Sequence, residues 1–200
     1  MNLDHRARLA LASLATLVAS VTGIALAPAA SAASTVTVAT VQASVRPNAT
    51  GVTLTAGDSA TITAAGVWDT CGGGCPTDAN GIVDGFNADF VAPTARGGSL
   101  IGSLDGGTTW FAVGVGPTTI AGPGTLLLAD NDFNPSVCDW CYGDNSGSMT
   151  VTITVTPAAP AVPTDKAQCK ADGWRTFNLF KNQGDCVSYV ATHGRNQPAG

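Results

Sequence analysis

The chain contains no glutamate, and all fourteen of its acidic residues are aspartate. Short carboxylates favour turns and metal-binding loops, whereas glutamate favours helices. Charged residues of either sign make up only 12% of the sequence, while Gly, Thr, Val and Ala are abundant. The composition therefore predicts sheet and turns in preference to helix.

Histidine is also scarce. The chain has two, His5 and His193, and they lie near its two ends. The body between them has no histidine for a base–nucleophile pair and no Gly-rich phosphate loop that opens a helix. A pair of Asp could serve as acid and base in a glycosidase, but close pairs arise by chance when Asp is this common. We predict a binding protein and no enzyme, with a small Asp-pair hydrolase as the lesser alternative.

The first residues have the pattern of a secretory signal. Basic residues lead into an apolar run from 9 to 26, and the small residues Ala30, Ser31 and Ala32 follow. This pattern predicts cleavage after Ala32, so that residues 1–32 are a signal peptide and the mature protein is secreted and extracellular. A membrane anchor is the alternative reading, disfavoured by the polar residues within the run. No later segment is apolar enough to span a bilayer, so we expect no membrane insertion.

Six cysteines in an exported chain predict three disulfides. Cys169 and Cys186 have no other cysteine in their segment and are expected to pair. The other four allow three connectivities, and they also have the spacing of a four-thiolate zinc site, which an oxidising compartment disfavours. These four are Cys71, Cys75, Cys138 and Cys141.

Charge is divided unevenly along the chain. Residues 35–156 contain ten Asp against Arg46 and Arg96, a net charge of −8. Residues 165–200 carry three Asp against five Lys and Arg, a net charge of +2. The acidic part argues against nucleic acid as a partner and is compatible with cation binding.

Alternation of β-branched residues with turn signals predicts about eight strands and an all-β, jelly-roll β-sandwich over residues 33–156. We expect hairpins about residues 56–58 and 105–107, the latter an Asp-Gly-Gly turn. The expected strands are residues 35–45, 52–55, 59–64, 99–104, 108–115, 118–121, 124–129 and 148–156.

A different pattern follows the sandwich. Residues 157–164 form a Pro/Ala linker, and residues 165–193 are predicted to be a small helical tail that needs its disulfide because it is too short for an independent core. We expect helices from residue 165 to 170 and from 186 to 192, and a disordered end at residues 194–200.

Polar oxygens gather between the last two strands. The apolar run 126–128 leads into Asp130, Asn131 and Asp132, and Asp144 and Asn145 precede the final strand. Calcium takes six to eight oxygen ligands of this kind, although Asp and Asn also favour ordinary turns. The segment predicts a metal-binding loop.

Two runs resemble the bacterial PA-IL galactose-binding lectin family. They are residues 57–68, a Gly-Asp hairpin leading into a strand that ends at Trp68, and residues 142–148, Tyr-Gly-Asp-Asn-Ser-Gly-Ser, preceded by Asn131 and Asp132. The resemblance covers most of residues 35–156 and none of the tail. It implies a jelly-roll sandwich that binds sugar through Ca²⁺, with sugar hydroxyls completing the coordination of the metal.

The resemblance also implies site residues. The metal ligands would be the side chains of Asp132, Asp144 and Asn145 with the main-chain carbonyls of Cys71 and Cys141. Because those two carbonyls would converge on one ion, we hypothesise disulfides that join the two loops to each other, with local Cys71–Cys75 and Cys138–Cys141 pairs as the alternative. The residues implied for sugar binding are Asp132, Asn145, Trp140, Asp78 and Asn80.

These observations predict a secreted, calcium-dependent carbohydrate-binding protein whose partner is a glycan or a cell-envelope polysaccharide. An exported structural or adhesive sandwich without sugar binding is the alternative. The tail resembles a Cys-stapled C-terminal segment that recurs on exported actinobacterial proteins, and it is a candidate for retention at the cell surface.

Overall fold

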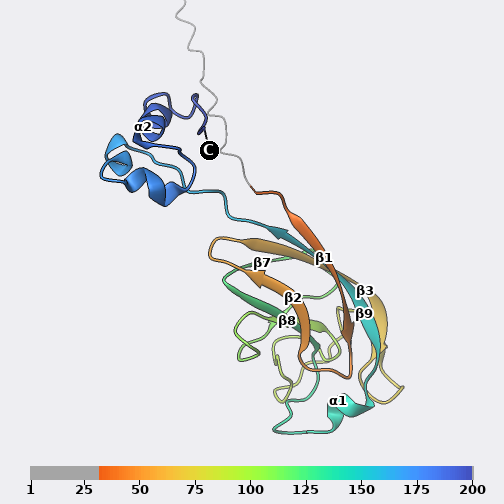
Figure 1. The fold of residues 1–200 in the computed structure, drawn as a ribbon. Coiled ribbons are helices and arrows are strands. Elements are labelled where there is room, and N and C mark those ends of the chain that lie inside the picture. The colour runs from red at the N-terminus through yellow and green to blue at the C-terminus, as the bar shows by residue number, and fades with distance from the viewer. Residues whose placement is uncertain (1–31, 200) are drawn as a thin grey trace, which may run out of the picture.

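The computed structural model describes residues 32–199, so the predicted signal segment lies outside the described residues except for Ala32. Two antiparallel sheets pack into a sandwich, and a small helical unit follows at one end (Figure 1). Among residues 32–199 we find no helix with the length and apolar character needed to cross a membrane.

Successive long strands of the sandwich fall in different sheets, as in a jelly roll. The prediction of an all-β sandwich is therefore confirmed. The first sheet has the order β1-β9-β3-β4, with β7 also on β3, and contains β1 (Thr35–Gln42), β3 (Ser59–Asp69), β4 (Pro76–Thr77), β7 (Thr118–Ala121) and β9 (Ser146–Thr156). The second has the order β2-β8-β5-β6 and contains β2 (Asn48–Leu54), β5 (Leu100–Ser103), β6 (Phe111–Ala112) and β8 (Gly124–Asp130).

Period-two patterning places the core between the sheets. Along β9, Met149, Val151 and Ile153 are fully buried, whereas the threonines between them face outward. Trp68, at the end of β3, is buried and its indole Nε1 donates to the carbonyl of Gly98 at 2.7 Å. This bond ties the end of β3 to the loop that leads into β5.

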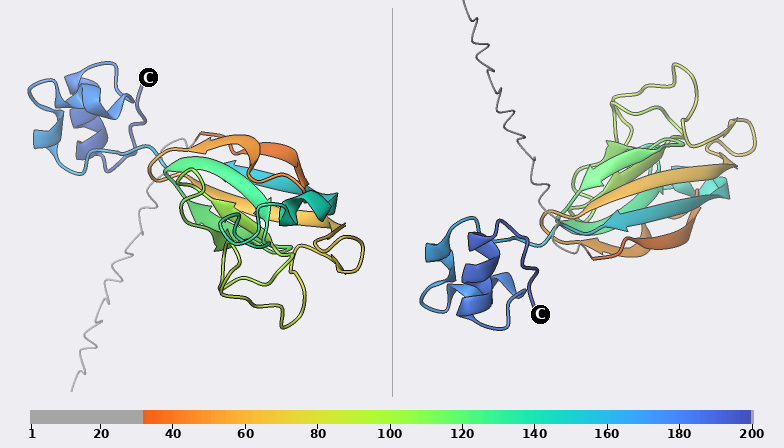
Figure 2. Two further views of the ribbon diagram at one scale, coloured as in Figure 1. Left: turned by 90° about the horizontal axis from the view of Figure 1, so that it is seen from below. Right: turned by 90° about the horizontal axis from the view of Figure 1, so that it is seen from above.

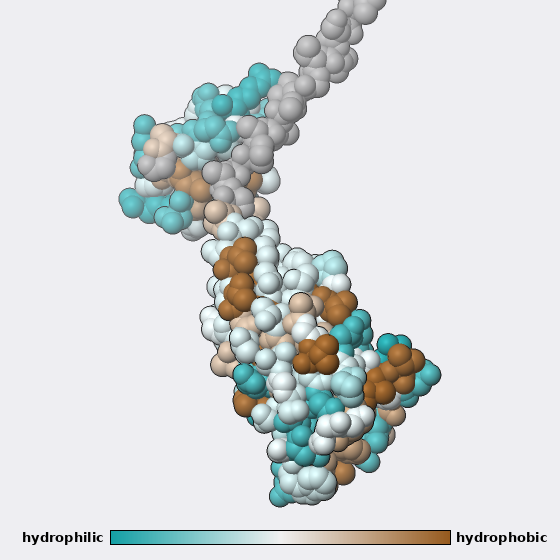
Figure 3. All heavy atoms as spheres, turned by 90° about the vertical axis from the view of Figure 1, so that its right-hand side faces the viewer, coloured by the Kyte–Doolittle hydropathy of each residue, from teal (hydrophilic) through white to brown (hydrophobic). Residues whose placement is uncertain are grey.

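The outer face of the first sheet is uncharged over its central strands. Most of the surface seen in Figure 3 is pale, and its apolar residues form small separate groups. Cross-strand neighbours on this face are mostly threonines, among them Thr61, Thr63, Thr150, Thr152 and Thr154.

One of the two predicted hairpins is wrong. The turn at residues 55–58 joins β2 to β3, but β2 pairs with β8 and β3 pairs with β9, so the turn crosses between sheets. A Gly-Asp turn reverses the chain both in a hairpin and in a crossing between sheets. Only the strands with which the flanking segments pair distinguish the two. The second hairpin is confirmed, because Ile101 of β5 pairs with Ala112 of β6.

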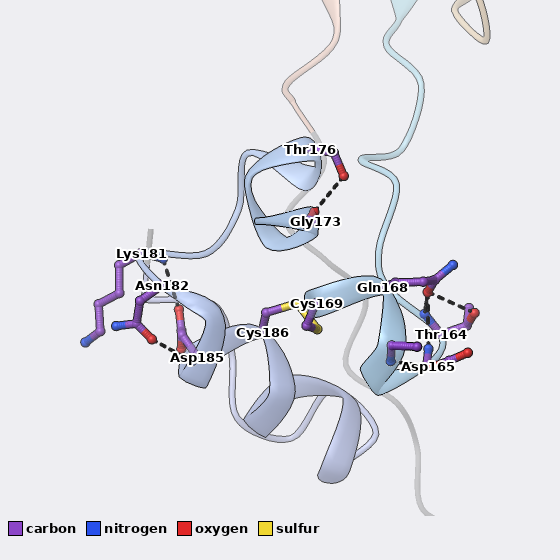
Figure 4. Close-up of a disulfide and its surroundings, with 11 residues drawn as sticks. Thr164, Asp165, Gln168, Cys169, Gly173, Thr176, Lys181, Asn182, Asp185 and Cys186 are labelled. Carbon is purple, nitrogen blue, oxygen red and sulfur yellow. Dashed lines mark hydrogen bonds between the residues drawn. A yellow bond between two sulfur atoms is a disulfide. The ribbon is translucent and has the colours of Figure 1, made fainter. Parts of the chain in front are cut away.

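The tail begins after the linker and contains three short helices: η1 (Lys166–Cys169), η2 (Gly173–Phe177) and α2 (Gln183–Ala191). The Cys169–Cys186 disulfide joins η1 to α2, as Figure 4 shows. Asp165 caps η1 and Asn182 caps α2. The 3₁₀ helix η2 was not expected, and residues near the C-terminus lie against α2 through a bond from Ala199 N to Asp185.

Candidate metal and ligand site at one end of the sandwich

Three chain segments meet at the end of the sandwich opposite the tail. β8 ends at Asp130, α1 (Cys141–Asp144) precedes β9, and the loop of residues 70–75 follows β3. Figure 1 shows α1 at the lower end of the sandwich, away from α2, and Figure 2 shows the same separation from two other directions. The sheet pairing brings these segments together, because Asp69 at the end of β3 pairs with Ser146 at the start of β9.

A buried polar cluster occupies this end. The Nδ2 atom of Asn145 donates to Oδ2 of Asp130 at 3.2 Å and to Oδ2 of Asp132 at 3.0 Å. All three residues are buried, with exposed fractions of 6%, 0% and 5% for Asn145, Asp130 and Asp132. The hydroxyl of Tyr142 donates to the main-chain carbonyl of Asp130 at 2.8 Å, which fixes α1 against the end of β8. One amide thus bridges two carboxylates in a largely dry environment.

Two oxygens in this cluster have no hydrogen-bond partner among residues 32–199. They are Oδ1 of Asp130 and Oδ1 of Asn145. Buried acceptors without a partner are rare, because each costs roughly 1–3 kcal/mol of lost solvation. Both atoms are acceptors, so a cation or a donor would satisfy them.

The electrostatics of the cluster point the same way. Burial raises the pKa of Asp130 to about 8, and the neighbouring carboxylate of Asp132 acts in the same direction. Burial also raises the pKa of Asp132, and the charge of Asp144 adds to it. Gathering carboxylates in a buried place is unfavourable for their charged forms, and an oxygen-seeking divalent cation reverses that penalty.

The loop after β3 reaches the same place. A Cβ atom built on Gly72 would lie 3.6 Å from Oδ2 of the exposed Asp144, so the loop from Cys71 to Cys75 lies beside the end of α1. The structure therefore brings Asp132 and Asn145 into contact and places Asp144 and the Cys71 loop next to them.

The cysteines pair within each loop, and the hypothesis of disulfides joining the two loops is wrong. The disulfides are Cys71–Cys75 and Cys138–Cys141, with Cα–Cα distances of 5.5 and 5.6 Å. Each short loop brings its own cysteines within the geometry of a disulfide, so no second loop is needed. All six thiols are used in disulfides, which excludes a four-thiolate zinc site.

The side chains of the other predicted residues make no hydrogen bond to the cluster within residues 32–199. Asp78 and Asn80 follow β4, where Asp78 accepts from the main-chain N of Asn80 at 2.8 Å and Asn80 Oδ1 accepts from Val115 N at 3.2 Å. Trp140 precedes α1 and is 68% exposed, so its ring is free to meet a ligand.

Asp130 was in the predicted oxygen-rich loop but was not among the predicted ligands. Alternation at the end of a strand could have identified it, because Asp130 and Asp132 project to one side and Asn131 to the other. Asn131 is fully buried and holds a different loop: it accepts from Ala92 N and donates to the carbonyls of Ala92, Ala95 and Arg96.

The donor set suits a hard cation. Counting only His, Cys, Asp and Glu side chains, residues 32–199 contain no group of three that could hold a metal ion. A site here would therefore depend on the Asn145 amide oxygen and on main-chain carbonyls as well as carboxylates, which is the mixture that calcium accepts.

Comparison with known proteins gives partial similarities. No family model matches the chain. Two UPF0167 proteins, from Mycobacterium bovis and Mycobacterium tuberculosis, are each 27% identical over 93 residues, covering 42% of this chain. The chain spans about half the length of these curated relatives, 48% in each case. Among solved structures, the N-terminal domain of EclA, described as a PllA-like lectin, is 26% identical with a TM-score of 0.44, covering 58% of this chain and 93% of that domain.

Proposed function

We propose that this protein is an exported, calcium-dependent carbohydrate-binding protein. The observation that carries the proposal is the pair of buried, unpartnered oxygens of Asp130 and Asn145 within a cluster of carboxylates. The three disulfides support export, because such bonds persist in oxidising compartments.

In this proposal Asp132, Asp144 and Asn145 hold the calcium ion with main-chain carbonyls near Cys71 and Cys141. Asp130 accepts from the amide of Asn145 and orients it, and a bound cation would favour the charged form of this buried carboxylate. Bound calcium contributes coordination positions for two neighbouring hydroxyls of a sugar. Asn145 is buried and its Nδ2 is held by two carboxylates, so its orientation is set before any ligand arrives.

Trp140 is the exposed aromatic side chain nearest in sequence to the cluster. Its ring offers an apolar face to the C–H groups of a sugar, whose hydroxyls would turn towards the metal. A neutral glycan is the ligand class that this combination favours, and its binding at this end of the sandwich needs no catalytic base.

Calorimetric titration of the mature chain with calcium tests the metal, and glycan-array binding with and without chelator tests the sugar. We expect calcium binding by the native chain, loss of that binding in Asp132→Asn, and no change in Asp89→Asn. Asp89 is a suitable control because it is an exposed carboxylate of the same domain. Calcium binding without any glycan would support the structural or adhesive alternative, and glycan hydrolysis lost in Asp132→Asn would support the hydrolase.

A further inference from the structure

The two arginines of the sandwich have different surroundings. The guanidinium of Arg46 lies over the rings of Trp110 and Tyr142, at 5.5 and 5.9 Å from their centroids. The half-buried Arg96 has no ion-pair or aromatic partner for its side chain among residues 32–199. In a domain with ten Asp, a guanidinium without a carboxylate partner is available to a ligand.

Arg96 lines a cleft of about 310 Å³. The loop between β4 and β5 supplies Asn80, Phe86, Thr94 and Arg96 to its lining, and β6 with the residues after it supplies Ala112 and Gly114. Figure 2 shows this loop, in yellow-green, standing out from the sandwich. The volume is at the lower end of the range for small-molecule sites, about 300–1,000 Å³, and suits one sugar ring.

The loop that carries Arg96 is held in place by main-chain bonds. Ile82 N donates to Gly97 O at 2.9 Å, and Gly97 N donates to Gly85 O at 2.7 Å. Asn131 Nδ2 donates to the carbonyl of Arg96 itself at 3.0 Å. The cleft is therefore a built feature of the fold, and its shape does not depend on a bound metal.

The chemistry of the lining specifies the ligand. A guanidinium has five N–H donors and no acceptor, and its planar fork matches the two oxygens of a carboxylate. The ring of Phe86 is 56% exposed and offers an apolar face in the same cleft. Asn80 Oδ1 already accepts from Val115 N, which leaves its amide nitrogen, 3.5 Å from Asp78, as the donor end. A sugar ring that carries a carboxylate satisfies both the fork and the aromatic face.

We propose that this cleft is a second, metal-independent site that binds a carboxylate-bearing sugar. The site is distinct from the cluster at Asp130 and Asn145, because Asn131 lies between them and projects away from that cluster. The inference does not rest on calcium binding or on the proposed lectin function.

Titration of isotope-labelled mature protein with glucuronate, in the presence of chelator and followed by NMR, tests the proposal. We expect saturable shifts at Phe86, Thr94, Arg96 and Gly114, and binding at least tenfold weaker for glucose, which lacks the carboxylate, and for acetate, which lacks the ring. Arg96→Gln should abolish glucuronate binding and Phe86→Ala should weaken it severalfold. Arg195→Gln, which removes an exposed arginine of the tail, should change nothing.

Three outcomes would overturn the proposal. Acetate or inorganic phosphate binding as tightly as glucuronate would reduce the cleft to a simple anion site. Glucuronate binding that disappears with chelator, or shifts confined to the Asp132 region, would assign the sugar to the metal cluster instead. If Arg96→Gln fails to fold, Arg96→Lys keeps the charge without the fork, and unweakened binding by that variant would contradict bidentate recognition.

Discussion

The sandwich and the tail are stabilised in different ways. The sandwich buries a continuous core between two sheets, and its two disulfides close loops with sequence separations of only 4 and 3 residues. The tail has four buried core residues, two of which are the cysteines of its own disulfide, which has a sequence separation of 17. The comparison shows the same bond in two roles: shaping loops around a candidate site in one region and replacing a core in the other.

The largest expected effect follows from this difference. Replacing Cys169 and Cys186 together by Ala should unfold the tail and leave the sandwich folded. A loop of about 15 residues contributes roughly 3 kcal/mol when cross-linked, and a core this small has little else to offset chain entropy. The NMR signals of the Trp174 indole, in the tail, and the Trp68 indole, in the sandwich, report on the two regions separately. Simultaneous loss of both signals would contradict the independence of the two regions.

The second largest expected effect concerns the stability of the sandwich alone. Asn131→Ala should destabilise the sandwich by at least about 2 kcal/mol, because it leaves the carbonyl of Ala95 and the N–H of Ala92 without partners. The carbonyls of Ala92 and Arg96 keep their bonds from Ala95 N and from Ser99. Asn134→Ala is the matched control in the following loop, where the amide accepts only from Ser136. Urea unfolding monitored at Trp68 measures both variants. Equal urea midpoints for the two variants would show that the stability of the loop between β4 and β5 does not depend on Asn131.

Calcium should raise the stability of the sandwich and not that of the tail, which distinguishes the two regions without any mutation. A ligand at 100 times its Kd stabilises the folded state by about 2.7 kcal/mol, and we expect this gain for the sandwich alone. Asp130→Asn should weaken the affinity for calcium by roughly 10–100-fold, because it removes the carboxylate that orients the amide of the proposed ligand Asn145. Thermal unfolding followed at both indoles, with calcium and with chelator, makes the measurement. A calcium shift at Trp174 as large as that at Trp68 would contradict a site confined to the sandwich.

Alternating sequence predicted the strands well where one face is buried. The strand at residues 118–121 has the predicted bounds, and the strand that begins at 124 differs by one residue at its end. Pairing was harder, since the turn at residues 55–58 is compatible with a hairpin or with a crossing between sheets. Partner choice depends on segments far away in sequence, and β3 pairs with β9 over its whole length.

The gathering of polar residues at one end of the sandwich was easier to predict than its details. The oxygen-rich segment between two strands contains Asp130, Asp132 and Asn145, which the structure brings together. The contact of Asp130 with Asn145 was missed because the short helix α1 that positions Asn145 has no helical period to reveal it. The local pairing of four cysteines could not be chosen from spacing, since every connectivity was open until the loops were placed.

The smallest expected effect concerns a turn of the sandwich that is held by the side chain of Asp105. Asp105 accepts from the N–H and hydroxyl of Thr109 and from the hydroxyl of Ser103, and these bonds lower its pKa from 3.8 to about 2. Because the folded pKa is below the unfolded one, Asp105 contributes stability that is complete above about pH 4 and is lost as the pH falls towards 2. Asp105→Asn should therefore lose less sandwich stability than the native chain over this interval, measured as urea midpoints at Trp68. Parallel pH profiles for the two proteins would show that the charge of Asp105 adds nothing to the turn.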